Sequence, residues 1–170
     1  MHEVFQGMVV NFAEKKEVVD RWVNEARFVR DASESFESDR VMGRQPSYLS
    51  EFGELFREEI TQFCKGIQSN LNLYDAWLVR YNKGDWHIPH AHGHLGYSGI
   101  ILIDYDTNEH SGPWFIKDSV DPITGSTTFI GGHQYQPGTI FITRSDRIHF
   151  TFPNPVNKPK VTLAFDLKPE

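Results

Sequence analysis

This 170-residue sequence contains one cysteine, no long apolar run and no N-terminal targeting pattern. The lone thiol, Cys64, excludes an internal disulfide framework, fits a reducing compartment and is most simply a small buried hydrophobe. No apolar stretch approaches the length of a membrane span, and the first residues lack the basic start and apolar block of a signal peptide. We therefore expect a cytoplasmic protein with no membrane partner.

Positive charge is also scarce, because 17 Lys and Arg stand against 23 Asp and Glu, which gives a net charge of −6 at pH 7. That balance disfavours a long nucleic acid as a partner, since phosphate backbones bind through clustered Lys and Arg. Aromatic residues are abundant instead, and the 13 Phe and 4 Trp indicate a packed interior. The length suits a single domain over 1–170.

Two amphipathic helices are predicted in the first part of the chain, as a helical support over 14–72. The first is expected at Glu14–Ala32, where apolar residues recur at helical spacing between charged ones. The second begins at Pro46 and Ser47, carries an apolar stripe and ends near Gly66. Such a stripe can cover the chain's own sheet or a partner's, so the sequence leaves the oligomeric state open.

From residue 73 the hydrophobic period changes from helical to two. About eight short strands are predicted over 73–168, each rich in β-branched or aromatic residues and bounded by turn residues. They are Ala76–Tyr81, Trp86–His92, Tyr97–Asp104, Pro113–Asp118, Thr127–Ile130, Thr139–Thr143, Arg147–Phe152 and Lys160–Leu167. Strands in this number after two helices favour a mainly β fold, a jelly roll or barrel with the helices on one outer face.

Four of the eight histidines fall within the nine residues 86–94. In an extended strand His90, His92 and His94 share a face, as metal ligands must. A histidine-rich exposed loop with only adventitious metal binding has the same composition. Three neutral imidazoles suit Zn or Fe, and one strand needs a ligand from elsewhere to complete the site. His149 is the natural addition, because it alternates with apolar neighbours in a predicted strand.

Two further histidines, His110 and His133, stand among Ser, Gly and Gln in predicted loops, and both are interpreted as solvated. Lys160 has a default interpretation as a surface lysine. However, it alternates with the apolar residues of the last strand, which would turn it into the same cavity as His149. A buried ammonium requires an anionic partner, and a dicarboxylate that also chelates the metal would supply one.

Several motifs stand in order around these residues. They are Tyr81-Asn82-Lys83-Gly84-Asp85-Trp86, His90-Ala91-His92, Tyr97-Ser98-Gly99-Ile100 and Gln136-Pro137-Gly138-Thr139-Ile140-Phe141-Ile142. With them, the chain from about Asp75 to Leu167 resembles the double-stranded β-helix core of the Fe(II)- and 2-oxoglutarate-dependent dioxygenases, particularly the prolyl 4-hydroxylase-like branch and its phage relatives. This family separates its last iron ligand and the basic residue that holds 2-oxoglutarate as His149 and Lys160 are separated here.

The resemblance implies that iron is held by His90, His92 and His149, and that the distal carboxylate of 2-oxoglutarate pairs with Lys160. The two-residue spacing of the family and the break at Gly93 argue against a role for His94. One departure matters, because the family pattern places Asp or Glu where this chain has His92. A carboxylate from another strand is an alternative, and the nearest candidates are Asp104 and Asp106.

Weaker roles follow from the same resemblance. Tyr81, Thr162 and Ser98 are candidate hydrogen-bond donors to 2-oxoglutarate, although core packing explains Tyr81 equally well. Candidate residues of the substrate mouth are Trp86, His87 and Trp114, with His87 expected off the ligand face. If the strand phases slip by one residue, the anion anchor would be Arg80, Arg144 or Arg147.

The resemblance implies a hydroxylase that consumes O2 and 2-oxoglutarate and acts on a peptide, prolyl-like side chain or a small molecule, in the host cytoplasm if the source is viral. Two alternatives stay open. A cupin-like enzyme with a three-histidine metal centre would share the fold without using 2-oxoglutarate. A non-catalytic, metal-binding phage accessory protein would share the site without the chemistry.

Overall fold

The computed structural model describes residues 4–41, 43–120, 123–124, 127–132 and 134–170. The helices are α1 (Phe12–Glu25), α2 (Leu49–Leu55) and α3 (Arg57–Ile67). The strands are β1 (Val4–Met8), β2 (Glu37–Ser38), β3 (Leu71–Tyr81), β4 (His87–His90), β5 (Tyr97–Asp104), β6 (Trp114–Val120), β7 (Thr127–Gly131), β8 (Thr139–Arg144), β9 (His149–Thr151) and β10 (Lys160–Pro169). None of the helices in the described ranges is long and apolar enough to cross a membrane.

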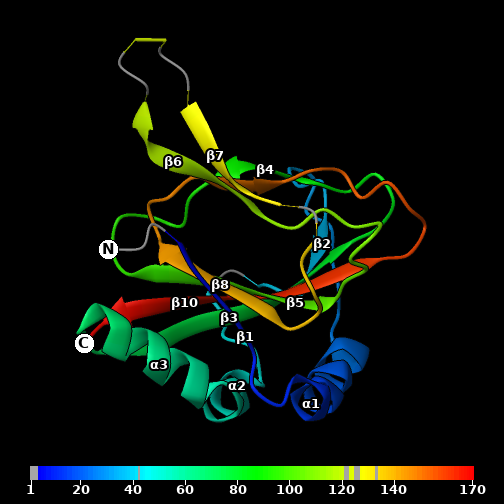
Figure 1. Ribbon diagram of the computed structural model, residues 1–170. Coiled ribbons are helices and arrows are strands. Elements are labelled where there is room, and N and C mark those ends of the chain that lie inside the picture. Colours follow the sequence, from blue (N-terminus) through cyan, green and yellow to red (C-terminus); the bar gives the residue numbers. More distant parts are fainter. Residues whose placement is uncertain (1–3, 42, 121–122, 125–126, 133) are drawn as a thin grey trace.

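The strands form two antiparallel sheets that face one another (Figure 1). The major sheet has the order β1-β8-β5-β10-β3-β2, and the minor sheet has the order β4-β9-β6-β7. Because the chain passes back and forth between the sheets, strands far apart in sequence become neighbours, as β10 does between β3 and β5. This is a jelly roll of the double-stranded β-helix type, so the predicted mainly β fold with N-terminal helices is confirmed.

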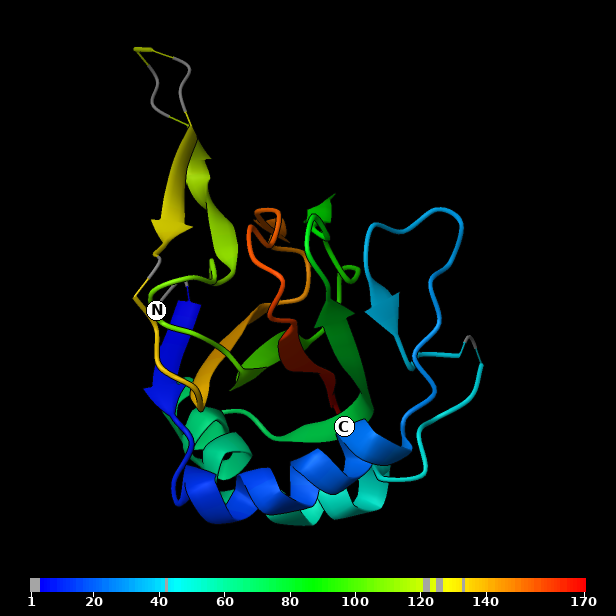
Figure 2. The same ribbon diagram turned by 90° about the vertical axis from the view of Figure 1, so that its right-hand side faces the viewer.

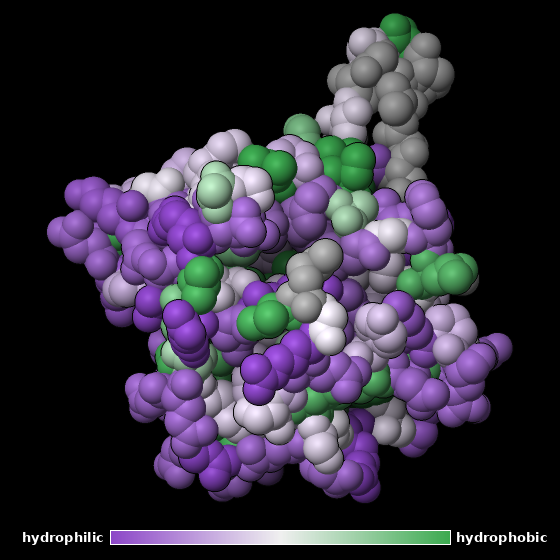
Figure 3. Space-filling model, turned by 180° about the vertical axis from the view of Figure 1, so that it is seen from behind, coloured by the Kyte–Doolittle hydropathy of each residue, from purple (hydrophilic) through white to green (hydrophobic). Residues whose placement is uncertain are grey.

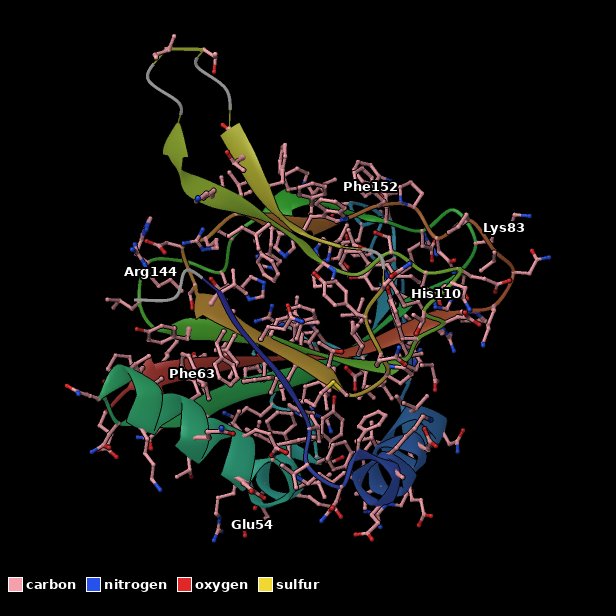
Figure 4. The ribbon with its side chains drawn as sticks, in the orientation of Figure 1. Glu54, Phe63, Lys83, His110, Arg144 and Phe152 are labelled. Atoms are coloured by element: carbon pink, nitrogen blue, oxygen red, sulfur yellow. The ribbon has the colours of Figure 1, made fainter. Side chains whose placement is uncertain are left out.

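The three helices cover the outer face of the major sheet (Figures 1 and 2). Aromatic side chains fill the space between the two layers, and the rings of Phe52 and Phe165 lie 5.3 Å apart. Phe63 projects from α3 toward the sheet in Figure 4. Gly99 lets the Phe165 ring lie flat on β5, since a Cβ at this position would approach the ring to 2.0 Å. The helical stripe thus covers the chain's own sheet.

The helical boundaries differ from those predicted. Helix α1 ends at Glu25 instead of Ala32, because the backbone turns extended at Ala26 and Val29 forms a bridge to Ser38. The second predicted helix is two helices separated at Phe56. In addition, β1 and β2 were not predicted, and both join edges of the major sheet, so the segment 14–72 is not purely helical.

Strand β10 crosses the centre of the major sheet, and every residue from Lys160 to Leu167 is buried. Val161, Leu163 and Phe165 pack toward the helices, as the alternation predicted. Lys160 and its in-phase neighbours turn the other way, into the space between the sheets. One strand therefore supplies both the main apolar core and a polar inner surface.

The face of the molecule seen from behind in Figure 3 is mostly hydrophilic, with small, separate groups of apolar residues. Strands β6 and β7 form a hairpin that extends from the minor sheet beyond the other strands (Figures 1 and 2). Phe152, labelled in Figure 4, lies on the outer side of this sheet, and its ring contacts that of Trp114 at 5.6 Å.

Candidate metal centre

A cavity lies between the two sheets. The major sheet contributes residues of β3, β5 and β10 that stand directly opposite one another, such as Lys160 with Tyr81 and Thr162 with Val79. The minor sheet closes the other side with β4 and β9. The lining residues are Trp77, Val79, Tyr81, His87, His90, His92, Ile100, Leu102, Pro113, His149, Phe150, Thr151, Lys160, Thr162 and Ala164.

Three predicted ligands meet at one end of this cavity. His90 ends β4 and pairs directly with His149 on β9, while His92 follows β4 with its backbone N–H bonded to Ser145 O at 2.8 Å. One ligand atom from each imidazole lies within 4.8 Å of the other two. Sheet pairing therefore brings together residues nearly sixty positions apart. His94 is exposed and takes no part in the cluster.

The hydrogen bonds of the three rings fix which nitrogen carries the proton. Nδ1–H of His90 donates to Ile88 O at 2.8 Å, and Nδ1–H of His149 donates to Arg147 O at 3.1 Å. Nδ1–H of His92 donates to Asp166 Oδ1 at 3.0 Å. Since a neutral imidazole has one N–H, all three Nε2 atoms are left with a free lone pair. Outer partners hold metal-binding histidines in this manner.

Burial keeps His90 and His149 neutral. Burial, together with the neighbouring imidazoles, lowers the pKa of His90 to about 4 and that of His149 to about 3. The Nε2 atoms of His90 and His92 are only 3.2 Å apart, so two lone pairs face each other. A cation between them would relieve that repulsion. The donor set, neutral nitrogen atoms with their other sides bonded, fits Zn or Fe.

Among the described residues, the carboxylate that bonds a ring of the cluster is Asp166, which the sequence interpretation missed. It lies on β10 behind the His92 ring and also accepts the Ser98 hydroxyl at 2.7 Å. Burial alone would raise its pKa, but the bonds from His92 and Ser98 outweigh that effect and the pKa is lowered. The suggested alternatives are wrong, because Asp104 pairs with Lys16 and Asp106 with Lys158 on the outside.

Lys160 lies toward the other end of the cavity and is 3% exposed. Its ammonium donates to Thr151 Oγ1 at 2.7 Å and to Ser111 O at 2.9 Å, and it sits 4.4 Å from the centre of the Tyr81 ring. Among the residues that the structure describes, no carboxylate pairs with it. Burial accordingly lowers the pKa of Lys160 to about 7.

Tyr81 and Thr162 line the cavity beside Lys160. Burial raises the pKa of Tyr81 well above its ordinary value, so its hydroxyl keeps the proton that it can donate. His87 was expected off the ligand face, which is wrong, because it lines the cavity. Its ring stacks on that of His90 with the ring centres 3.8 Å apart, and its Nδ1 lies 3.2 Å from the Tyr81 hydroxyl oxygen. Ser98 does not line the cavity, because it faces Asp166.

The alternative anion anchors point elsewhere. Arg80 pairs with Glu37 at 2.7 Å, and Arg147 donates to a peptide carbonyl of β6. Arg144 lies at the outer edge of the sheet in Figure 4 and bonds Asp146. The strand phases therefore did not slip, and the cation among the cavity-lining residues is Lys160.

The two tryptophans proposed for the substrate mouth, Trp86 and Trp114, lie outside the cavity lining. Trp86 is 39% exposed, and Trp114 donates its indole N–H to Ser111 Oγ at 3.2 Å. His110 was interpreted as solvated, which is wrong, since it is buried and bonds the Asp106 amide and a backbone carbonyl. Figure 4 shows it among the side chains at one end of the sandwich. His133 lies outside the described residues.

One smaller correction concerns Cys64, which is half-buried on α3 instead of buried. It lines a shallow depression with Ile60 and Leu71, well away from the histidine cluster. The single thiol thus has no contact with the cavity that the two sheets enclose.

Comparison with protein-family models and with curated proteins finds no match. The fold does match solved structures. A prolyl-4-hydroxylase of Pseudomonas putida aligns with a TM-score of 0.65 and 11% identity, over 100% of this chain and 94% of that chain. A viral collagen prolyl hydroxylase of Paramecium Bursaria Chlorella virus-1, solved as a 2-oxoglutarate complex, gives 0.68 and 10%, over 99% and 97%.

HygX of Streptomyces hygroscopicus, solved with nickel, 2-oxoglutarate and hygromycin B, gives a TM-score of 0.72 and 10% identity, over 98% of this chain and 83% of that chain. At such identities the likeness concerns the backbone. It confirms the structural side of the resemblance seen in the sequence: this chain has the fold of the prolyl-4-hydroxylases and other 2-oxoglutarate and iron oxygenases.

Proposed function

We propose that this protein is an Fe(II)- and 2-oxoglutarate-dependent oxygenase. One observation carries the proposal: a single buried cavity presents three imidazole lone pairs at one end and, at the other, an ammonium with no carboxylate partner among the described residues. The first end suits a divalent cation and the second an anion. The fold agrees, because structures similar to it hold 2-oxoglutarate, in two cases with nickel.

In this proposal the iron is held by His90, His92 and His149. The five-carbon co-substrate would reach from the iron to Lys160, whose partner Thr151 stands two residues after His149 on β9. Two residues of a strand span roughly 7 Å, so His149 and Thr151 are separated by a length that suits a dicarboxylate. Charge-assisted hydrogen bonds are the strong ones, so the ammonium is the main anchor of the far carboxylate.

Tyr81 and Thr162 complete the proposed anion site with hydroxyl donors. Val79, Leu102 and Ala164 give the cavity an apolar lining that excludes water from the bound groups. When bound, the iron with O2 supplies the oxidation, in which 2-oxoglutarate loses CO2 to become succinate and a substrate C–H becomes C–OH. The protein orients the reactants.

We propose a peptide, prolyl-like side chain or a small molecule as the substrate. Support comes from similar structures, which include prolyl hydroxylases and a protein solved with hygromycin B. His87 is the member of the predicted substrate mouth that reaches the cavity, where it lies between Tyr81 and His90. Its ring is therefore placed to contact a substrate that enters beside the metal.

The test is conversion of 2-oxoglutarate to succinate, followed by NMR, with Fe(II), O2 and a proline-containing peptide or small-molecule panel. Wild-type protein should form succinate only with iron present. The Lys160→Ala variant should still bind metal but form at most a few per cent as much. Failure of metal-loaded wild type to form succinate under every condition would contradict the oxygenase proposal.

A second candidate function is a cupin-like metalloenzyme that does not use 2-oxoglutarate. The observation in its favour is the ligand set itself, since three histidines replace the usual two histidines and one carboxylate. Metal-loaded protein would then ignore 2-oxoglutarate, and Lys160→Ala would leave its metal-dependent chemistry intact. Binding of 2-oxoglutarate by calorimetry separates the two functions.

A further inference from the structure

The carboxylate of Asp166 lies directly behind the metal-facing ring of His92. Its Oδ1 accepts the Nδ1–H of His92 at 3.0 Å and the hydroxyl of Ser98 at 2.7 Å. Its place on β10 is fixed by pairing with Asp75 on β3 and with Ser98 on β5. Asp166 is 8% exposed, so little water competes for the carboxylate.

His92 is held at its backbone as well as its ring. Its N–H donates to Ser145 O at 2.8 Å, and the Ser145 hydroxyl lies 3.1 Å from that of Ser98. Since the Ser98 hydroxyl donates to Asp166, Ser145 is the donor to Ser98. The bonds form a closed ring of four residues, which fixes both the backbone and the imidazole of His92.

The three ligand histidines differ in what accepts their Nδ1 protons. His90 and His149 donate to neutral peptide carbonyls, whereas His92 donates to a carboxylate. An ionised acceptor makes the stronger bond and makes the opposite nitrogen a better electron donor. His92 is also the ligand that stands where the family pattern has Asp or Glu. The missing negative charge is thus present, but one residue farther from the metal.

We propose that Asp166 is a positioning residue that holds His92 with Nε2 toward the metal and restores the charge of the absent carboxylate ligand. Three neutral imidazoles leave a divalent ion with two net positive charges, and Asp166 reduces the charge of the whole site to one. This inference rests on the metal site of the proposed function. It assigns the carboxylate on which that site depends.

The experiment measures Zn(II) affinity by competition with a chelator, without 2-oxoglutarate. Asp166→Ala removes both the acceptor and the charge, and should weaken binding 10- to 100-fold. Asp166→Asn keeps an acceptor for Nδ1–H and loses only the charge, so its loss should be smaller, several-fold. Asp75→Asn is the matched control, because Asp75 stands opposite Asp166 in the sheet while its carboxylate accepts a bond from Arg40. The Zn(II) affinity of this variant should stay within about threefold of the wild-type value.

A second readout reports on the ring itself. Long-range ¹⁵N NMR of the metal-free protein should show the proton of His92 on Nδ1 in wild type and in Asp166→Asn. In Asp166→Ala a substantial fraction should move to Nε2, since nothing then fixes the tautomer. A merely structural carboxylate would change thermal stability without changing this tautomer. If Asp166→Ala does not fold, Ser98→Ala should still lower Zn(II) affinity measurably, and Asp166→Asn should behave as stated.

Wild-type affinity and tautomer in every foldable Asp166 variant would overturn the inference. An Asp166→Asn variant that binds Zn(II) as wild type does would overturn the role of the charge. These failures differ from failure of the proposed function: tight Zn(II) binding that responds to Asp166, with no 2-oxoglutarate binding, would sink the oxygenase proposal and leave the inference standing.

Discussion

The two ends of the cavity differ in the sign of the charge that each can receive. At one end, His90, His92 and His149 turn lone pairs inward while their protons point outward to oxygen acceptors. At the other end, the partners of the Lys160 ammonium within the described part of the chain are a hydroxyl, a carbonyl and an aromatic ring. Packing alone explains neither end, because buried polar groups are normally paired.

The histidine end therefore suits a cation and the lysine end suits an anion, so the two ends take ligands of opposite charge. A dianionic chelator bound to a metal at the histidines would place its free carboxylate at the lysine, so one molecule would neutralise both ends. If the two ends are functionally linked in this way, mutations at each should affect different binding events. Variants at each end and changes of pH separate metal binding from 2-oxoglutarate binding.

The largest effect is expected at the histidine end. His90→Ala removes a metal ligand and should weaken Zn(II) or Co(II) binding by more than about 100-fold, beyond the loss that an outer partner causes. His94→Ala is the matched control, since this histidine is four residues away, exposed and outside the cluster. Equal metal affinity of the two variants in a chelator competition would show that the metal does not bind at His90 in the cavity.

At the lysine end, Lys160→Ala should weaken 2-oxoglutarate binding to the metal-loaded protein by on the order of 10- to 100-fold, the value of a hydrogen bond to a charged group. Metal affinity should not change. Lys158→Ala is the control, because that lysine forms an exposed pair with Asp106. Calorimetry that finds 2-oxoglutarate binding unchanged in Lys160→Ala would break the proposed link between the two ends.

The affinity for 2-oxoglutarate should depend on pH through Lys160. Its pKa in the free protein is about 7, so at higher pH the neutral amine must gain a proton before it can pair with a carboxylate. Affinity should be level just below pH 7 and fall about tenfold per unit above it. Calorimetry at pH 8 in two buffers of different ionisation enthalpy should show proton uptake, and a flat profile from pH 7 to 9 would exclude this mechanism.

The sign for stability follows from the same shift. The ordinary pKa of a lysine is 10.5, and in the folded protein the pKa of Lys160 is lowered to about 7. The unfolded chain therefore binds more protons than the folded protein between pH 7 and 10.5. This group therefore makes the free energy of unfolding rise with pH across that window. Lys160→Met should remove this contribution, which chemical denaturation at pH 7 and 9 can measure.

The smallest effect is expected from Thr162→Val, a nearly isosteric change in the cavity. It removes a hydroxyl that bonds Tyr81 and should weaken 2-oxoglutarate binding only a few-fold, the value of one neutral hydrogen bond. Metal affinity should not change. A loss as large as that of Lys160→Ala would show that the anion is held mainly by hydroxyl groups.

Much of the site could be predicted because β10 alternates with period two. Val161 and Leu163 face the helices, and Lys160 faces the cavity, so phase alone placed the lysine. The same phase also includes Asp166, six residues after Lys160. A carboxylate in phase with Lys160 on an otherwise apolar strand is a signal that the sequence contains, whereas Asp104 and Asp106 stand at turns and pair with lysines outside the cavity.

Other features depended on contacts that a linear pattern does not contain. His110 follows a polar turn, and its burial comes from the backbone of a segment nearly fifty residues later. Strand β1 is short, with a side-chain pattern that acquires meaning only from its pairing with β8. Likewise, Val29 fits a helical stripe but bonds Ser38, so tertiary pairing overrode local propensity.

The most direct test is an anaerobic titration of the protein with Fe(II) in the presence of 2-oxoglutarate. If the two ends act together, a visible chelate band should appear and saturate at one iron per chain. His90→Ala should abolish the band, and Lys160→Ala should require much higher 2-oxoglutarate concentrations. Iron bound by the histidines without any such band would contradict the proposal that this cavity joins a metal to a dicarboxylate.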